Sequence, residues 1–250
     1  ESQVMSAQED TFISHLIELR DRLLRAVVAV VAVFVCLMPW AGDIYDILAH
    51  PMMTALPEGT KMIATGVVTP FFVPMKVTLL VAFVIALPFV LYQAWCFIAP
   101  GLYAHEKRLG LPLVVGSTVL FLAGMAFCYF FVFGTVFKFI AQFAPKSITP
   151  APDIEQYLAF VMSMFLAFGI TFEVPVIVIV LVKLGIVDVA KLKEARPYVI
   201  VGAFVIAAVV TPPDVVSQLM LAVPMCLLYE LGIFLARFVS KTRADEVVSS

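Results

Sequence analysis

The apolar run from Tyr157 to Val182 contains a single ionisable side chain, Glu173. The run is longer than the roughly 20 residues that a helix needs to cross a bilayer. The whole chain is 63% hydrophobic and 14% charged, whereas a soluble domain is about 45–50% apolar and about 25% charged. One soluble core cannot bury this excess, so we predict an all-α polytopic membrane protein.

Six apolar segments are predicted to span the membrane. They are Leu23–Ala41, Met75–Ile98, Leu109–Phe133, Tyr157–Val182, Tyr198–Thr211 and Val215–Phe238. The fifth segment extends only about 21 Å at a rise of about 1.5 Å per residue, against about 30 Å of hydrocarbon. The bilayer must therefore thin there, or neighbouring helices must shelter this segment. We expect the six helices to form one integral membrane domain over residues 1–250.

Basic residues are unequally divided between the two sets of connecting segments. One set holds only Lys61, Lys76, Lys138 and Lys146. The other set holds twelve: Arg20, Arg22, Arg25, Lys107, Arg108, Lys183, Lys191, Lys193, Arg196, Arg237, Lys241 and Arg243. Because cytoplasmic segments are enriched in lysine and arginine, both termini are predicted to be cytoplasmic.

Two outside loops, Gly42–Pro74 and Gly134–Gln156, differ in character. The first has apolar residues at helical spacing over Ile44–Leu56, which predicts a short helix lying at the interface. The second is rich in proline. Prolines also stand within or at the edges of the predicted spans: Pro88, Pro112, Pro175 and Pro224. Kinks at these positions could make the bundle concave, or neighbouring helices could absorb them without any function.

The sequence lacks the motifs of P-loop nucleotide-binding proteins, zinc-dependent hydrolases and serine hydrolases. We expect the three histidines, His15, His50 and His105, to lie in loops without ligand spacing. The net charge of −2 gives no global field for nucleic acid. We therefore expect no cofactor, no metal and no nucleic-acid partner.

Two of the acids in predicted cytoplasmic segments are candidate binding residues. Glu18 belongs to an amphipathic lead-in, His15–Arg25, and Glu106 to the loop Phe97–Arg108. One interpretation is structural: Glu18 pairs with Arg22 four residues later, and Glu106 is neutralised by its cationic neighbours. The other is a receptor for a basic peptide, since a carboxylate can accept two hydrogen bonds from one arginine.

Two further acids at or inside the spans are candidate functional residues. Glu173 is either a structural acid or a functional one, because charges at bilayer depth are costly and usually functional. Asp214 opens the last span and is suited to cap its N-terminus.

These residues together resemble the TatC family, the polytopic subunit of the twin-arginine protein translocase. The resemblance runs from about Thr11 to Ser240. The matching stretches are HLIELRDRL (15–23), FIAPGLYAHEKR (97–108), FGITFEVPV (168–176), RPYVIVGAFV (196–205) and TPPDVVSQ (211–218).

The resemblance implies a concave, cupped bundle of six helices in the bacterial cytoplasmic (inner) membrane. It implies binding of the twin-arginine signal peptides of folded cargo, with Glu18, Arg20, Phe97 and Glu106 as the site. It also implies an oligomeric assembly with TatA-type and TatB-type single-span subunits, driven by the proton-motive force. Intramembrane polar contacts to these partners would fall on Glu173, Asp214 and Gln218. We expect no enzymatic activity.

One stretch departs from the family pattern, because Thr65–Phe72 lacks the acid that many members carry in the first outside loop. Two other classes of function are weighed. A proton-coupled small-solute carrier would use Glu173 as its protonated group but should show related halves, and none is found. An intramembrane enzyme would need a second catalytic group at the depth of Glu173, and the sequence offers none.

Overall fold

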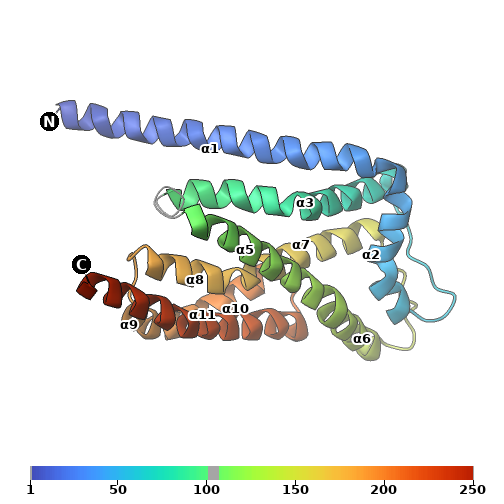
Figure 1. Cartoon of the computed structure of the whole chain (residues 1–250). Coiled ribbons are helices and arrows are strands. Elements are labelled where there is room, and N and C mark those ends of the chain that lie inside the picture. Colours follow the sequence, from blue (N-terminus) through green and yellow to red (C-terminus); the bar gives the residue numbers. More distant parts are fainter. Residues whose placement is uncertain (1, 101–106, 250) are drawn as a thin grey trace. The chain divides into compact units, whose positions relative to one another are not determined.

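The computed structural model describes the backbone of residues 2–100 and 107–249 and the side chains of residues 11–100 and 110–239. Over this part the chain is helical, with one isolated bridge between Ile63 and Asp153 in place of any strand. The helices are α1 (Ser2–Leu37), α2 (Ala41–Ala55), α3 (Thr69–Ile98), α5 (Lys107–Phe127), α6 (Phe133–Phe143), α7 (Ile154–Phe172), α8 (Val174–Lys183), α9 (Val189–Glu194), α10 (Arg196–Val210) and α11 (Val215–Ser249) (Figure 1). The prediction of an all-α fold is confirmed.

Among the described residues, five helical segments are long and apolar enough to cross a membrane. They are Thr11–Ala55, Thr69–Ile98, Gly110–Phe143, Ile154–Lys183 and Val215–Val239. The remaining predicted span, the fifth, corresponds to α10, whose 15 residues extend about 22 Å. The short fifth helix is thus confirmed, as is the helix predicted over Ile44–Leu56, which is α2.

The predicted boundary at Phe133 is wrong, because the third span continues to Phe143. It passes through a π turn, η2 (Cys128–Val132), into α6. Gly134 is a poor helix former, but the rings of Phe133 and Phe137 stack with centroids 5.7 Å apart on buried faces. Tertiary contacts of this kind override local propensity.

Three more sequence-based expectations are corrected. The second span begins at Thr69 rather than Met75, because Pro70 occupies the first turn, where no backbone N–H is needed. Helical backbone also reaches beyond the predicted first and last spans, to Ser2 and Ser249. His15 and His50 lie in α1 and α2 rather than in loops, and His105 lies outside the described residues.

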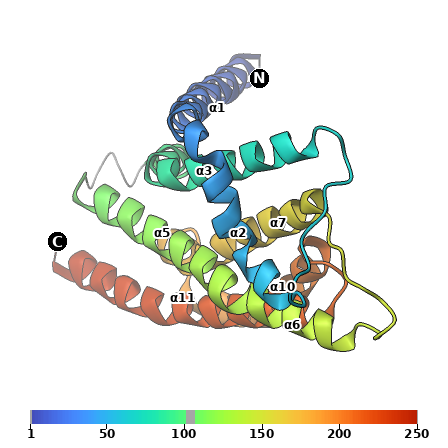
Figure 2. The same ribbon diagram turned by 90° about the vertical axis from the view of Figure 1, so that its right-hand side faces the viewer.

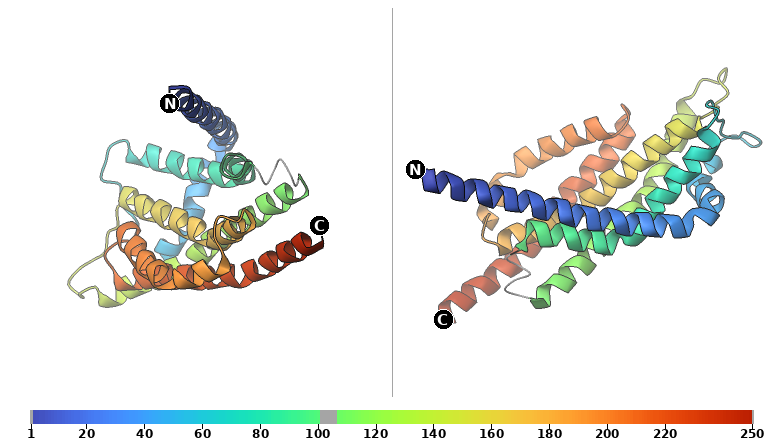
Figure 3. Two further views of the ribbon diagram at one scale, coloured as in Figure 1. Left: turned by 90° about the vertical axis from the view of Figure 1, so that its left-hand side faces the viewer. Right: turned by 90° about the horizontal axis from the view of Figure 1, so that it is seen from above.

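The chain forms two compact units. Unit 1 comprises residues 1–44 and 75–118, and unit 2 comprises residues 45–74 and 119–250. In unit 1, α1 and α3 run side by side (Figure 3), and the buried Trp95 Nε1–H of α3 donates to Ser117 Oγ of α5 at 2.9 Å. The expectation of a single domain stays a prediction.

In unit 2, α8 lies along α11 (Figure 1). Gly232 permits this approach, because a Cβ built there would stand 3.1 Å from Pro175 Cα and 3.1 Å from Val178 Cβ. Buried apolar residues from α8, α9 and α11 form the adjoining core: Val178, Val182, Leu192, Tyr229, Ile233 and Ala236. The Tyr229 hydroxyl donates to the Leu192 carbonyl at 2.7 Å and so fixes α9 to α11.

Two loops of unit 2 that are predicted to lie outside, 56–68 and 144–153, are joined to each other (Figure 2). Ile63 N donates to Pro152 O and Ile154 N donates to Ile63 O, each at 2.9 Å. Asp153, the N-cap of α7, accepts from the Thr65 hydroxyl at 2.5 Å and from Glu155 N at 3.0 Å. These two hydrogen bonds, the Thr65 one foremost, hold the pKa of the Asp153 carboxyl below its ordinary value. The loops therefore lie on one side of unit 2, as the predicted topology requires.

Candidate functional sites

The first candidate site is in unit 1 and centres on Glu18 of α1. Arg22, one helical turn later, contacts Glu18 Oε1 with Nε and Nη2, each at 2.9 Å. This confirms the predicted i,i+4 pair. Both contacts use Oε1, and the Glu18 side chain is 42% exposed. Arg22 therefore leaves the second carboxylate oxygen, Oε2, uncontacted.

Residues of α3 complete this site. Gln93, buried at 5% exposure, accepts from Arg22 Nη1 through its side-chain oxygen at 3.1 Å. One turn further along α3, Phe97 stacks on the His15 ring with centroids 4.3 Å apart and planes 24° apart. His15, Glu18 and Arg22 therefore line the side of α1 that meets Gln93 and Phe97. We call these five residues the α1–α3 site.

The structure separates Arg20 from Glu18. Arg20 forms an exposed pair with Asp21, with Nη2–Oδ1 at 2.9 Å. Glu106 lies outside the described residues. The sequence analysis did not include His15 and Gln93 in the site, although the position of each in the sequence is compatible with membership. His15 precedes Glu18 and Arg22 at helical spacing, and Gln93 is an amide placed four residues before Phe97 in an apolar span.

The second candidate site is Glu173 in unit 2. The predicted single helix is interrupted there, because Glu173 (φ −75°, ψ −14°) ends α7 and precedes α8. Pro175 has no backbone N–H, so it cannot continue the α-helical ladder to Thr171. On the two sides of this break, the Glu173 N–H donates to Ile170 O at 3.0 Å, and Ile177 N donates to Glu173 O at 3.0 Å. The residue is buried, at 7% exposure.

Asp214 caps α11, as the structural interpretation predicts. Its Oδ1 accepts from Ser217 N at 2.7 Å, and its carbonyl accepts from Gln218 N at 3.3 Å. Glu173 lies beside a different part of α11 from Asp214 and Gln218, because neighbouring Pro175 packs against Gly232. From Gln218 to Gly232 the helix rises about 21 Å, so the structure does not bring Glu173 together with Asp214 and Gln218.

Within the described part of the chain, no three His, Cys, Asp or Glu side chains are grouped so as to hold a metal ion. The side chains of the two candidate sites are carboxylates, a guanidinium, an amide and aromatic rings. The fold and these sites define a polytopic helical membrane protein with a carboxylate-bearing site on one helix pair and a buried acid at a helix break.

Comparison with known proteins places this membrane protein in a family. The family model for the Sec-independent protein translocase protein (TatC) matches residues 14–224. The chain is 53% identical to the Sec-independent protein translocase protein TatC of Haemophilus influenzae over 231 residues, covering 92% of this chain and 90% of that protein. It is 51% identical to the Escherichia coli K12 protein of the same name over 241 residues, covering 95% and 93%. The chain belongs to the TatC family of protein translocase subunits.

Solved structures agree with this assignment. A crystal structure of the twin-arginine translocase receptor TatC superposes with a TM-score of 0.78 at 39% identity, covering 90% of this chain and 99% of that one. A second crystal structure of the twin-arginine translocase receptor TatC, determined in DDM, superposes with a TM-score of 0.79 at 40% identity. The chain is thus a translocase component of the membrane, and nothing in these comparisons supports the alternative of a small-solute carrier.

Proposed function

We propose that this chain is the receptor subunit of a twin-arginine translocase and binds twin-arginine signal peptides at the α1–α3 site. The observation that carries the proposal is the Glu18 side chain, which is 42% exposed and is held by Arg22 through Oε1 alone. A guanidinium from the peptide can bind Oε2 without displacing Arg22. The stacked His15 and Phe97 rings offer a flat surface for the second arginine, which favours aromatic faces.

Arg20 and Glu106 complete the proposed peptide-binding surface beside Phe97. Arg20 is exposed beside Asp21, so it would contact acidic or carbonyl groups of the peptide rather than its arginines. Glu106, which follows α3 in the sequence, would supply the second carboxylate that a pair of adjacent arginines requires.

Export of a twin-arginine reporter in cells lacking their own TatC tests this proposal. The wild-type chain should restore export, and Glu18→Ala should lose most of it while the protein stays in the membrane. Asp188→Ala is a matched control, because Asp188 caps α9 without a side-chain hydrogen bond. Normal export by the Glu18, Glu106 double alanine variant would reject the assignment.

We further propose that unit 2 recruits single-span subunits of the TatA and TatB types through Glu173, Asp214 and Gln218. A carboxyl at membrane depth is costly and favours polar contacts. The offset of about 21 Å between the level of Glu173 and Gln218 suits a single partner span of about 30 Å. Glu173→Ala should leave peptide crosslinking near normal but reduce crosslinking to the partner and export. Glu173→Gln should be milder, and normal export by Glu173→Ala would contradict this role.

The proposed setting is the bacterial inner membrane, with both termini in the cytoplasm and no catalytic reaction carried out by the chain. The excess of basic residues in one set of segments supports this orientation. Reporter fusions after Ser240 and within 185–195 should report the cytoplasm, and fusions near Pro57 and Lys146 the opposite side. A C-terminus on the opposite side would overturn the topology.

A further inference from the structure

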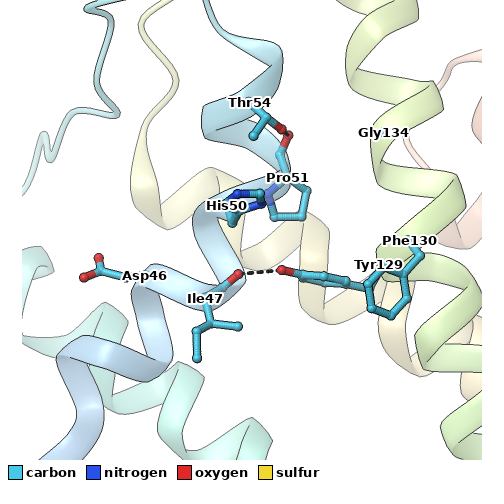
Figure 4. Close-up of a pocket in the computed structure, with 8 residues that line it drawn as sticks. All are labelled: Asp46, Ile47, His50, Pro51, Thr54, Tyr129, Phe130 and Gly134. Carbon is cyan, nitrogen blue, oxygen red and sulfur yellow. Dashed lines mark hydrogen bonds between the residues drawn. The ribbon is translucent and has the colours of Figure 1, made fainter.

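Pro51 stands inside α2 and removes one bond of its backbone ladder. In a regular helix the N–H of residue 51 would donate to the carbonyl of Ile47, and proline has no N–H. The Tyr129 hydroxyl donates to this carbonyl instead, at 2.8 Å. Figure 4 shows this bond reaching from the π turn to α2.

A second tyrosine enters the same ladder one position later. The Tyr157 hydroxyl of α7 donates to Leu48 O at 3.0 Å. Tyr157 is 5% exposed, so this hydrogen bond lies in a buried contact.

The position of Tyr129 depends on the π turn η2 (Cys128–Val132). A π turn accommodates one extra residue and changes which side chains face a neighbouring helix, and such turns are frequent at functional sites. Here Cys128 and Val132 are fully buried, whereas Phe130 is 73% exposed. Tyr129 lies between these two environments and its ring packs edge-on against Phe130.

We propose that Tyr129 and Tyr157 are positioning residues that dock α2 onto the rest of unit 2 through the successive carbonyls of Ile47 and Leu48, the first of which Pro51 leaves without its helical donor. Two spans thus hold one proline-containing helix. The docked α2 forms one wall of a groove of about 660 Å³ facing Tyr129, Phe130 and Gly134 (Figure 4). The consequence for export, that α2 must stay docked, rests on the function proposed above.

Hydrogen exchange of the full-length protein in detergent tests the docking. Tyr129→Phe and Tyr157→Phe should each raise exchange of α2 amides roughly 2–10-fold, the factor for one lost hydrogen bond. Tyr198→Phe is the matched control, because Tyr198 is 81% exposed on α10, and it should leave α2 unchanged.

Rescue by Pro51→Ala separates docking from a general loss of packing. Alanine restores the N–H to Ile47 O, so Tyr129→Phe should have little effect on α2 exchange in the Pro51→Ala background. An equal effect in both backgrounds, or no effect of either phenylalanine variant, would overturn the proposal.

An export assay measures whether the translocase needs a docked α2. The doubly substituted Tyr129→Phe, Tyr157→Phe protein should export less than wild type. Full export with a loosened α2 would overturn the positioning role, while the translocase assignment would stand on wild-type export.

Discussion

Arg196, in the first turn of α10, forms a two-contact ion pair with Glu230 of α11. Nη2 lies 2.7 Å from Oε2, and Nε lies 2.7 Å from Oε1. The Nη2 contact is a hydrogen bond, whereas the Nε contact is close but lacks hydrogen-bond geometry. Together with the bond from Tyr229 to Leu192, the pair holds α9 and the start of the short helix α10 against α11.

Breaking the ion pair between Arg196 and Glu230 should lower the thermodynamic stability of the protein only slightly. The side chains are 40% and 48% exposed, so a double-mutant cycle with Arg196→Gln and Glu230→Gln should give a coupling of about 0.2–1 kcal/mol. Thermal unfolding in detergent measures it, and high salt should reduce it. The exchanged pair, Arg196→Glu with Glu230→Arg, should recover part of the loss. Additive single effects would show that the contact contributes nothing.

The contact between the loops 56–68 and 144–153 should weaken in acid. The pKa of Asp153 is lowered from 3.8 by its bonds to Thr65 and Glu155, so the folded state binds this proton less readily than the unfolded state. The contribution of Asp153 to stability is therefore complete above about pH 5 and is lost as pH falls below 3.8. The difference in melting temperature between wild type and Asp153→Asn should be constant from pH 7 to 5 and shrink at lower pH. A pH-independent difference would contradict this account.

Gly124 should not tolerate alanine. A Cβ there would stand 2.4 Å from the Phe168 carbonyl oxygen, where α5 and α7 cross. The clash is with backbone, which cannot rotate away, so Gly124→Ala should destabilise by about 1–3 kcal/mol. Gly116→Ala on the same helix meets nothing within 4 Å and should stabilise by about 0.4–1 kcal/mol. Unfolding of both variants in detergent compares them, and equal stabilities would exclude the close crossing.

The sequence predicts those features that depend on local chemistry. Apolar length predicts the spans, Asp214 is a good N-cap residue, and the spacing of Glu18 and Arg22 predicts their pair. Other features depend on contacts between distant residues. The π turn that carries Tyr129, its bond to Ile47 and the partner role of Gln93 toward Arg22 have no local pattern that distinguishes them. Pro175 indicates a kink, but only the structure shows that the break falls at Glu173.

The central claim is that a twin-arginine peptide binds the α1–α3 site, and photo-crosslinking from the peptide tests it most directly. A photoreactive residue is placed next to the arginine pair of a signal peptide, and the crosslinked residues of the membrane-embedded chain are mapped by mass spectrometry. Crosslinks should fall within 15–22 and 93–97, and should be lost with a twin-lysine peptide or with Glu18→Ala. Crosslinks confined to unit 2, or equal crosslinking of twin-lysine and twin-arginine peptides, would contradict the account.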